Sequence, residues 1–292
     1  MSEEIYLHQI VRDENVSEVY SDDDIVIIDN VRKLVEPTPA RLQMNMLVIC
    51  TSGKGQGSIN GVPISIRRNQ VAVCPPNVTL SDFMISPDFE FKAMFFTTRI
   101  LQSFLREKMS VWNEVMYIQH MHVVTMEEKD IEYYTHFYEM LLLCIRQDEQ
   151  TPYRTEVVQA LLRAAFLALC GRMSQKGMLS ALPPGKQSAG NLFQRFLHLL
   201  SSDMVKHRTV ESFASELCIS AKYLSAVCKK SSGKTAGQWI TEHVMEEIRY
   251  QLCHTDHTLK QVSSMLGFPN TSFFGKYVKE HFGMTPLQLR QT

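Results

Sequence analysis

The last hundred residues of this 292-residue chain contain a repeat of themselves. Segment 210–219 matches 259–268 in the spacing of its apolar residues, with an offset of 49. Farther along the offset becomes 50, where Gly-x-Thr-x-x-Gln occurs at 233–238 and again at 283–288. One inserted residue explains the change of offset. Two copies of the same pattern indicate two copies of one small structural unit.

Each copy has the residue pattern of a helix-turn-helix motif. Its first short helix carries a small inward residue, Ala214 or Ser263, where the next helix crosses close to it. In the second copy Gly267 supplies a positive φ in the turn. The second helix then begins at Ser220 or Asn270, which are both preferred N-cap residues. We therefore expect two helix-turn-helix motifs.

The first motif is predicted at about 209–231 and the second at about 258–281. Between them, at about 235–253, apolar residues recur at helical spacing and predict a linker helix. Roughly 18 residues at ~1.5 Å each would make this helix about 27 Å long. Two recognition helices held by such a rod could enter successive major grooves, which lie ~34 Å apart on one face of DNA.

The second helix of each motif presents short polar side chains at its start and lysines farther along. Such a helix suits entry into a groove, with base contacts near its N-terminus and phosphate contacts beyond. The residues expected to bind DNA are Ser220, Ala221, Lys222, Tyr223, Ser225, Ala226, Lys229, Lys230, Asn270, Thr271, Ser272, Phe273, Lys276 and Lys279. The alternative for the lysines is a solvated helix face, but their recurrence in both copies favours phosphate contact.

Charge is divided unevenly along the chain. Residues 1–190 carry 18 Lys and Arg against 23 Asp and Glu, whereas 191–292 carry 12 against 8. The formal net charge of −1 alone would argue against a nucleic-acid-binding protein, but the basic C-terminal part suits one. Because its positive excess is modest, affinity for DNA is expected to depend on dimerisation or on two half-sites.

The preceding part of the chain, residues 20–125, has the pattern of short strands. Its β-branched or aromatic runs are bounded by turn-forming residues and lie at 25–28, 46–50, 71–74 and 89–97. Asn60-Gly61 predicts a two-residue hairpin, because a type I′ turn needs positive φ at both central residues. A small sandwich or barrel is therefore expected.

After the strands the spacing becomes helical. Thr125–Glu128 has the sequence of a capping box, and Thr151–Pro152 that of a second helix start, with Gly171 as a C-cap. This helix pair, at about 126–172, is apolar over much of its surface. The two helices either cover the barrel or also form an interface. Segment 174–190 is small, polar and proline-containing, which predicts a linker.

Residues 191–292 resemble the DNA-binding domain of the AraC/XylS family of bacterial transcription regulators, most specifically over 259–286, LKQVSSMLGFPNTSFFGKYVKEHFGMTP. With less specificity, residues 20–170 are similar to the cupin-type β-barrel and helix pair that many members use for effector binding and dimerisation. That likeness rests on Gly55-x-Gly57-x-Ile59-x-Gly61 and on the segment 71–76.

The resemblance implies a multi-domain α+β chain. A cupin-like β-barrel with a helix pair would occupy 1–173, with the barrel at about 20–125. After the linker, an all-α, homeodomain-like domain with two helix-turn-helix motifs would occupy 191–292. The implied function is sequence-specific transcription regulation controlled by a small-molecule effector or by the dimer state. The implied partners are double-stranded DNA, a second copy of the chain, an effector and RNA polymerase.

Two alternatives remain open. The barrel could bind no ligand and serve only for dimerisation or protein docking. A cupin-type enzyme with an accessory DNA domain is disfavoured, because residues 9–119 contain no histidine that could hold a metal in the barrel. His120 and His122 would share one face of a strand, but they have no obvious third ligand. The sequence predicts no catalytic residue, no metal and no cofactor.

Cysteine usage and the N-terminus predict the compartment. The seven cysteines include no Cys-x-x-Cys pair, which suits free thiols in a reducing compartment. The start of the chain lacks the basic and apolar regions of a signal peptide, and we expect no apolar run to approach the ~18 residues of a membrane span. These features predict a cytoplasmic protein without a membrane partner.

Overall fold

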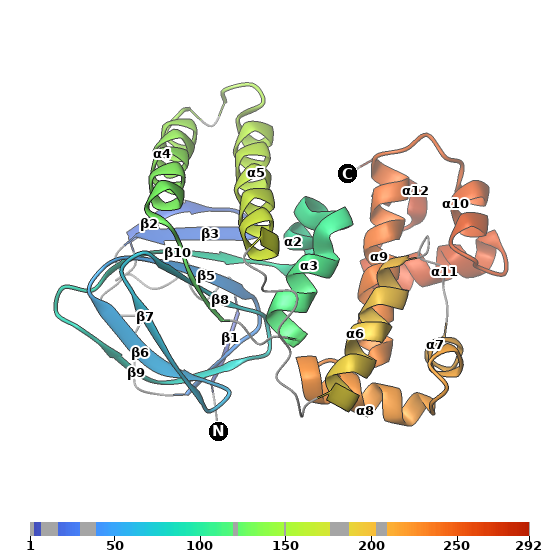
Figure 1. Cartoon of the computed structure of the whole chain (residues 1–292). Helices are drawn as coiled ribbons and strands as arrows, with labels where there is room; N and C mark the ends of the chain where they lie inside the picture. Colours follow the sequence, from blue (N-terminus) through green and yellow to red (C-terminus); the bar gives the residue numbers. More distant parts are fainter. Residues whose placement is uncertain are drawn as a thin grey trace. The chain divides into compact units, whose positions relative to one another are not determined.

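The computed structural model describes residues 3–6, 17–29, 39–118, 122–148, 150–175, 187–202 and 209–291. The chain divides into two compact units, Met1–Ser180 and Ala181–Thr292. Figure 1 shows strands and helices in the first unit, and in the second unit the described residues form helices only. The expected α+β class, with a β-rich first part and a helical second part, is confirmed.

Two β-sheets form the body of the first unit. The five-stranded sheet has the order β1 (Glu3–Ile5), β4 (Ala40–Leu42), β9 (Thr79–Ile85), β6 (Lys54–Ile59) and β7 (Val62–Arg67). The six-stranded sheet has the order β11 (Val123–Thr125), β8 (Gln70–Cys74), β5 (Asn45–Ser52), β10 (Glu90–Phe96), β3 (Ile25–Asp29) and β2 (Ser17–Ser21). Among the described residues no strand is shared between the sheets. The expected barrel is therefore built as two separate sheets rather than one closed ring.

The four expected strands are β3, β5, β8 and β10, and all lie in the six-stranded sheet. The hairpin between β6 and β7 is also confirmed, since Asn60 and Gly61 have φ of 50° and 76° and Ile59 pairs with Val62. The inner face of β6 is shaped by a second glycine, Gly57. A Cβ atom there would lie 2.7 Å from the ring of Phe83.

Residues 98–118 are helical, which corrects the expectation of strands throughout 20–125. They form α2 (Thr98–Leu105), a 3-10 turn (Arg106–Lys108), α3 (Met109–Asn113) and a π-helical turn (Glu114–Ile118). The Thr97 side chain caps α2 by accepting a hydrogen bond from the Ile100 amide. Strand β10 leads directly into the Thr97 cap. No Gly or Pro therefore marks the boundary between strand and helix in the sequence.

Helix α4 (Glu128–Ile145) starts later than expected. Its capping box is made by Glu127 and Asp130, so the box expected at Thr125–Glu128 is wrong. The reason is a long-range contact, because Thr125 pairs with Gln70 as the last residue of β11. Pairing within the sheet takes precedence over the local capping pattern.

Helix α5 (Arg154–Gln175) also differs from its prediction at both ends. It begins after Tyr153, whose φ of 62° ends the preceding turn, so Thr151–Pro152 is not its start. It continues through Gly171, which is therefore not a C-cap. Near the end of α5, the Arg172 guanidinium lies 2.5 Å from a carboxylate oxygen of Asp130, a buried residue at the start of α4.

By length and composition alone, α5 could cross a membrane: residues 154–174 have a mean hydropathy of 1.4 in their most apolar window, of which 33% is buried. The expectation that no apolar run reaches this length was wrong. The core helix of a protein without a membrane span passes the same test. One stripe of α5 is fully packed in the first unit, at Val158, Leu162, Phe166, Leu169 and Met173.

The second unit is a set of helices around one long helix. Its elements are α6 (Gln187–Ser202), α7 (Val210–Glu216), α8 (Ala221–Ser232), α9 (Ala236–Cys253), α10 (Leu259–Met265), α11 (Thr271–Phe282) and α12 (Pro286–Leu289). Helix α9 packs against α7, α8, α10, α11 and α12. Most of the segment expected as a linker, residues 176–186, lies outside the described residues.

The repeated Gly-x-Thr-x-x-Gln motif ends one helix and begins the next. Gly233 and Gly283 close α8 and α11 in the left-handed conformation, with φ of 76° and 71°. Thr235 then caps α9, while the side-chain oxygen of Gln238 accepts a hydrogen bond from the Thr235 amide, which completes a capping box. The second copy repeats this arrangement at the start of α12. Local capping chemistry explains why the motif recurs.

Candidate nucleic-acid interface

The two helix-turn-helix motifs are alike in hydrogen-bonding detail. In the first, the Ser220 hydroxyl caps α8 by accepting a hydrogen bond from the Tyr223 amide at 3.2 Å. In the second, the Asn270 side-chain Oδ1 caps α11 by accepting one from the Phe273 amide at 2.8 Å. The predicted N-cap residues therefore begin the second helix at equivalent positions in the two motifs.

The turns between the helices are also alike. Gly267 has the expected positive φ, 73°, and Cys218 occupies the matching position in the first copy with φ of 57°. In the first turn the Ile219 amide donates to the Ala214 carbonyl at 2.9 Å, and the second turn has the equivalent bond. This is the hydrogen bond of a Schellman motif, which needs a left-handed residue at this point. Sequence reasoning found the glycine and missed the cysteine.

The inner faces of α8 and α11 are packed within the second unit. Leu224 and Val227 are buried in α8, and Phe274 and Val278 in α11. Each pair lies three or four residues apart, so the opposite face of each helix is left toward solvent. These contacts fix which side chains each helix can offer to a partner.

The structure places the residues expected to bind DNA on those outer faces. Eight belong to α8 and its cap and six to α11 and its cap. All are exposed except Ala221 and Ser225, which are half-buried. Tyr223 and Phe273 stand at equivalent places near the start of each helix, 52% and 46% exposed. Each of these two aromatic residues therefore keeps about half of its surface accessible to a partner.

The lysines on these faces are uncompensated. Among the described residues, none of the following forms an ion pair: Lys222, Lys229, Lys230, Lys276 and Lys279. By contrast Lys234 is 7% exposed, lies 2.7 Å from a Glu242 carboxylate oxygen and sits over the Trp239 ring. Lys234 therefore supports the core of the unit, whereas the other five present free positive charge.

The described residues give little support to a reactive thiol or a metal site. Burial raises the pKa of the Cys74 and Cys228 thiols to about 12, so neither supplies a thiolate near neutral pH. The ring Nδ1 of His122 lies 3.1 Å from the Val73 carbonyl oxygen, and His120 lies outside the described residues. No group of three potential metal ligands occurs within the part of the chain that the structure describes.

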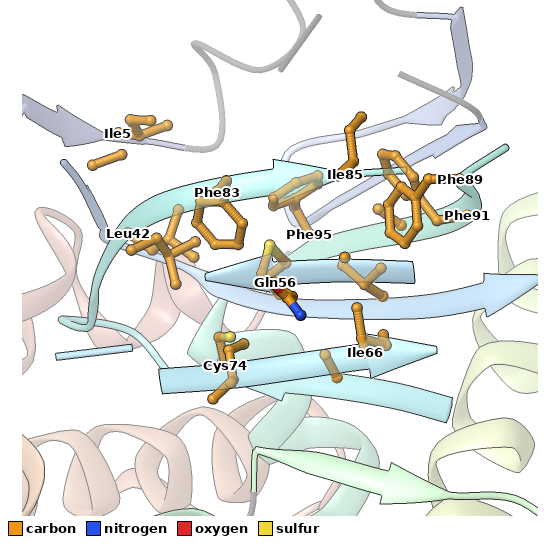
Figure 2. Close-up of a pocket in the computed structure, with 18 residues that line it drawn as sticks. Ile5, Leu42, Gln56, Ile66, Cys74, Phe83, Ile85, Phe89, Phe91 and Phe95 are labelled. Atoms are coloured by element: carbon orange, nitrogen blue, oxygen red, sulfur yellow. The ribbon is translucent and has the colours of Figure 1, made fainter. Parts of the chain in front are cut away.

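A cavity of about 170 Å³ lies between the two sheets of the first unit. Figure 2 shows apolar side chains gathered around it, with Phe83, Ile85 and Phe95 among the labelled residues. Gln56 carries the one polar amide among the described lining residues, and none of them is charged. This cavity could not be found from the sequence, because an inward apolar residue looks the same whether it fills a core or lines a space.

Comparison with known proteins identifies the second unit. Residues 213–292 match the family of helix-turn-helix domains. The regulatory protein PocR of Salmonella typhimurium is 29% identical over 98 residues, which are 34% of this chain and 32% of PocR. The C-terminal domain is an AraC-type helix-turn-helix domain. Such domains bind double-stranded DNA through the second helix of each motif.

One further curated relative and one solved structure also match. The Msm operon regulatory protein of Streptococcus mutans is 23% identical over 150 residues, 51% of this chain and 54% of that protein. The chain thus spans from a third to about half the length of these curated relatives. A crystal structure of ToxT from Vibrio cholerae is 15% identical, with a TM-score of 0.33, and covers 95% of this chain and 97% of ToxT.

Proposed function

We propose that this chain is a sequence-specific, DNA-binding transcription regulator. The observation that carries the proposal is the pair of equivalent recognition helices, α8 and α11. Each is held by the same cap and turn, and each exposes uncompensated lysines from an AraC-type domain. Free positive charge on an exposed helix suits phosphate and base edges, and no acidic residue lies within the predicted DNA-binding set.

In this proposal each helix reads bases from its N-terminal end. Lysine side chains there donate to the O6 and N7 acceptors of guanine, and small side chains admit the helix deep into the groove. The side-chain oxygen of Asn270 is used by the cap, which leaves its amide NH2 to donate to DNA. The residues assigned to base readout are Ala221, Lys222, Ser225, Ala226, Asn270, Thr271, Ser272 and Lys276.

Phosphate positioning is assigned to Lys229 and Lys279. Both lie in the last turn of their helix, and the carbonyl of each accepts the amide hydrogen bond of the closing glycine. Their equivalent places mean that the two motifs would grip the backbone alike. A cation in a last helical turn also interacts favourably with the helix dipole. A measurement of DNA binding separates phosphate contact from interaction with the helix dipole.

The first unit is assigned to the control of DNA binding. An uncharged apolar cavity between the sheets suits a small apolar effector. Effector binding would shift the arrangement of domains or protomers and so the affinity for paired sites, by linkage. A homodimer, RNA polymerase as a further partner and a cytoplasmic location belong to the same proposal. The relatives are transcription regulators, and we assign no catalytic role to this chain.

The alternative is a first unit that serves only for dimerisation or docking. The cavity between the sheets favours control by a ligand, because a docking module needs no interior space. An Ala93→Leu variant, which adds bulk at the buried lining residue Ala93, separates the two. Control by a ligand predicts that this variant no longer responds to the effector yet still binds DNA. A docking module predicts no difference between the variant and the wild-type chain.

The proposal is tested by removing one lysine from the base-reading set. Lys276→Ala is expected to weaken binding to the selected duplex by ~1–3 kcal/mol and to relax the base preference at one position. Lys54→Ala, which removes an exposed charge from β6 in the first unit, is the matched control. Competition titrations against specific and random duplex give both the loss of affinity and the change in base preference. Equal affinity for the two variants would contradict the assignment of Lys276.

A further inference from the structure

A second cavity, of about 230 Å³, lies in the first unit on the face of the six-stranded sheet opposite the cavity of Figure 2. Strands β5, β8 and β10 form its floor, and helices α4 and α5 cover it. We propose that it binds a small uncharged molecule, an apolar ring with one carbonyl group whose oxygen accepts a hydrogen bond from the Tyr134 hydroxyl. This ligand site is independent of DNA binding and of the effector assigned to the cavity between the sheets.

The two cavities share strands but no lining residue. Along β5, Met46 and Val48 line the cavity between the sheets, whereas Leu47 and Ile49 line the second one. Successive side chains of a strand point to opposite faces, so the sheet is a wall between two separate spaces. A substitution at one position of a strand can therefore alter one cavity and leave the other unchanged.

The floor of the second cavity is apolar and incompletely covered. Strand β5 lies between β8 and β10 in the sheet, and side chains on the helix-covered face of such a strand are normally buried. Leu47 and Ile49 are nevertheless only half-buried, as is Met94, the register partner of Leu47 in β10. In the helical cover, by contrast, Phe166 and Leu169 are each 3% exposed. A small apolar molecule would remove the remaining floor from water, which is favourable in proportion to the apolar area covered.

Tyr134 supplies the hydrogen-bonding group of the site. It lines the cavity from α4, and its hydroxyl is buried without a hydrogen-bond partner among the described residues. Burial raises the pKa of this hydroxyl, so it stays protonated and able to donate. An unpaired buried donor costs free energy, and a carbonyl oxygen on a ligand would remove that cost.

Other polar side chains of the lining already have partners. The Thr135 hydroxyl donates to the Ile131 carbonyl, one turn earlier in α4, at 2.8 Å. The Cys50 thiol donates to the Ser52 carbonyl, with the two heavy atoms 3.1 Å apart. These two groups are therefore not assigned to the ligand.

The charged residues of the lining do not favour an ion. Lys92 of β10 has an acidic register partner, Asp29 of β3, so no unbalanced charge is assigned to it. Arg68 is exposed, and water and salt screen its charge. An ion among the apolar side chains of the floor and cover would lose its hydration without gaining a counter-charge. The ligand is therefore expected to be neutral.

The volume sets the size of the ligand. An apolar cavity of about 150 Å³ accepts a benzene molecule. A space of about 230 Å³ therefore accommodates one six-membered ring with a short side chain. Acetophenone has this size and carries a carbonyl oxygen. In α-methylstyrene a CH2 group replaces that oxygen with little change of shape, so the two probes together isolate the hydrogen bond.

The test is NMR titration of the full chain with each probe. Tyr134→Phe keeps the ring and removes the hydroxyl. It is expected to weaken binding of acetophenone about 10-fold while changing that of α-methylstyrene less than about 2-fold. Ala165→Leu, which adds bulk at a half-buried lining residue of α5, is expected to abolish binding of both probes.

The matched control is Tyr133→Phe, the same change at a neighbouring tyrosine that is 48% exposed and does not line the cavity. It should leave both affinities unchanged, as should Ala93→Leu, which adds bulk in the cavity between the sheets. Loss of acetophenone binding in Ala93→Leu would place the ligand between the sheets and overturn the proposal. So would equal acetophenone affinity of Tyr134→Phe and the wild-type chain, or absence of acetophenone binding to the wild-type chain at millimolar concentrations.

Discussion

Replacing Cys218 by glycine is expected to stabilise the C-terminal unit, and replacing Gly267 by alanine to destabilise it. The two residues hold equivalent turns, with φ of 57° and 73°. A side chain in the left-handed conformation costs roughly 1–2 kcal/mol. Glycine avoids that cost but loses about 0.5–1 kcal/mol through its greater freedom in the unfolded chain. Because Cys218 is exposed, its removal sacrifices little packing.

The difference between the two contributions changes the free energy of unfolding by about 0.5–1 kcal/mol. Cys218→Gly is expected to raise it and Gly267→Ala to lower it. For a unit of this size, that difference shifts the midpoint of thermal unfolding by about 2–4 °C. A third substitution, Gly275→Ala, separates the effect of backbone conformation from that of side-chain volume. Gly275 lies inside α11, with open space around its Cβ position, so alanine there should stabilise the unit by about 0.5–1 kcal/mol.

The assay uses the two tryptophans of the chain. Trp112 is buried in the first unit and Trp239 in the second, so a Trp112→Phe background leaves a fluorescent reporter of the C-terminal unit alone. Urea unfolding of each variant in that background gives the free energy of unfolding. If Gly267→Ala and Gly275→Ala shifted stability in the same direction, the left-handed turn would not be the cause and the reasoning would fail.

Three further outcomes are expected. Gly57→Ala should destabilise the first unit by about 1–3 kcal/mol, measured by Trp fluorescence during urea unfolding, because the new methyl group meets the Phe83 ring. Lys279→Ala should reduce the slope of log affinity for DNA against log salt by about 0.9, and an unchanged slope would remove that lysine from the phosphate contacts. Asp130→Asn should lower stability by roughly 3 kcal/mol in the same unfolding assay, because it leaves the Arg172 charge without its buried partner. A loss below about 0.5 kcal/mol, the range of ordinary surface substitutions, would contradict that role.

Features fixed by local chemistry could be predicted from sequence. Asn60-Gly61 forms its hairpin because few other dipeptides accept positive φ twice in succession. The helix starts at Ser220 and Asn270 follow from capping groups within three residues. The exposed faces of α8 and α11 follow from helical periodicity, which needs no knowledge of the rest of the fold.

Features fixed by distant contacts could not be predicted from sequence. Thr125–Glu128 fits a capping box, yet Thr125 is taken up by a strand pair with Gln70, far away in sequence. Cys218 carries no preference for positive φ, and only its alignment with Gly267 could have indicated the conformation. Met46 and Leu47 are both apolar, so the sequence does not show that they line different cavities. Cavity volume depends on how whole elements meet.

In the proposed function, two helices read DNA together. The most direct test is selection from a random duplex library at near-physiological salt, with the full chain and in parallel with residues 187–292. We expect enrichment of a site with two boxes about ten base pairs apart, one for each recognition helix. Failure of both proteins to enrich any sequence, or enrichment of a single box that survives removal of either helix's lysines, would contradict it.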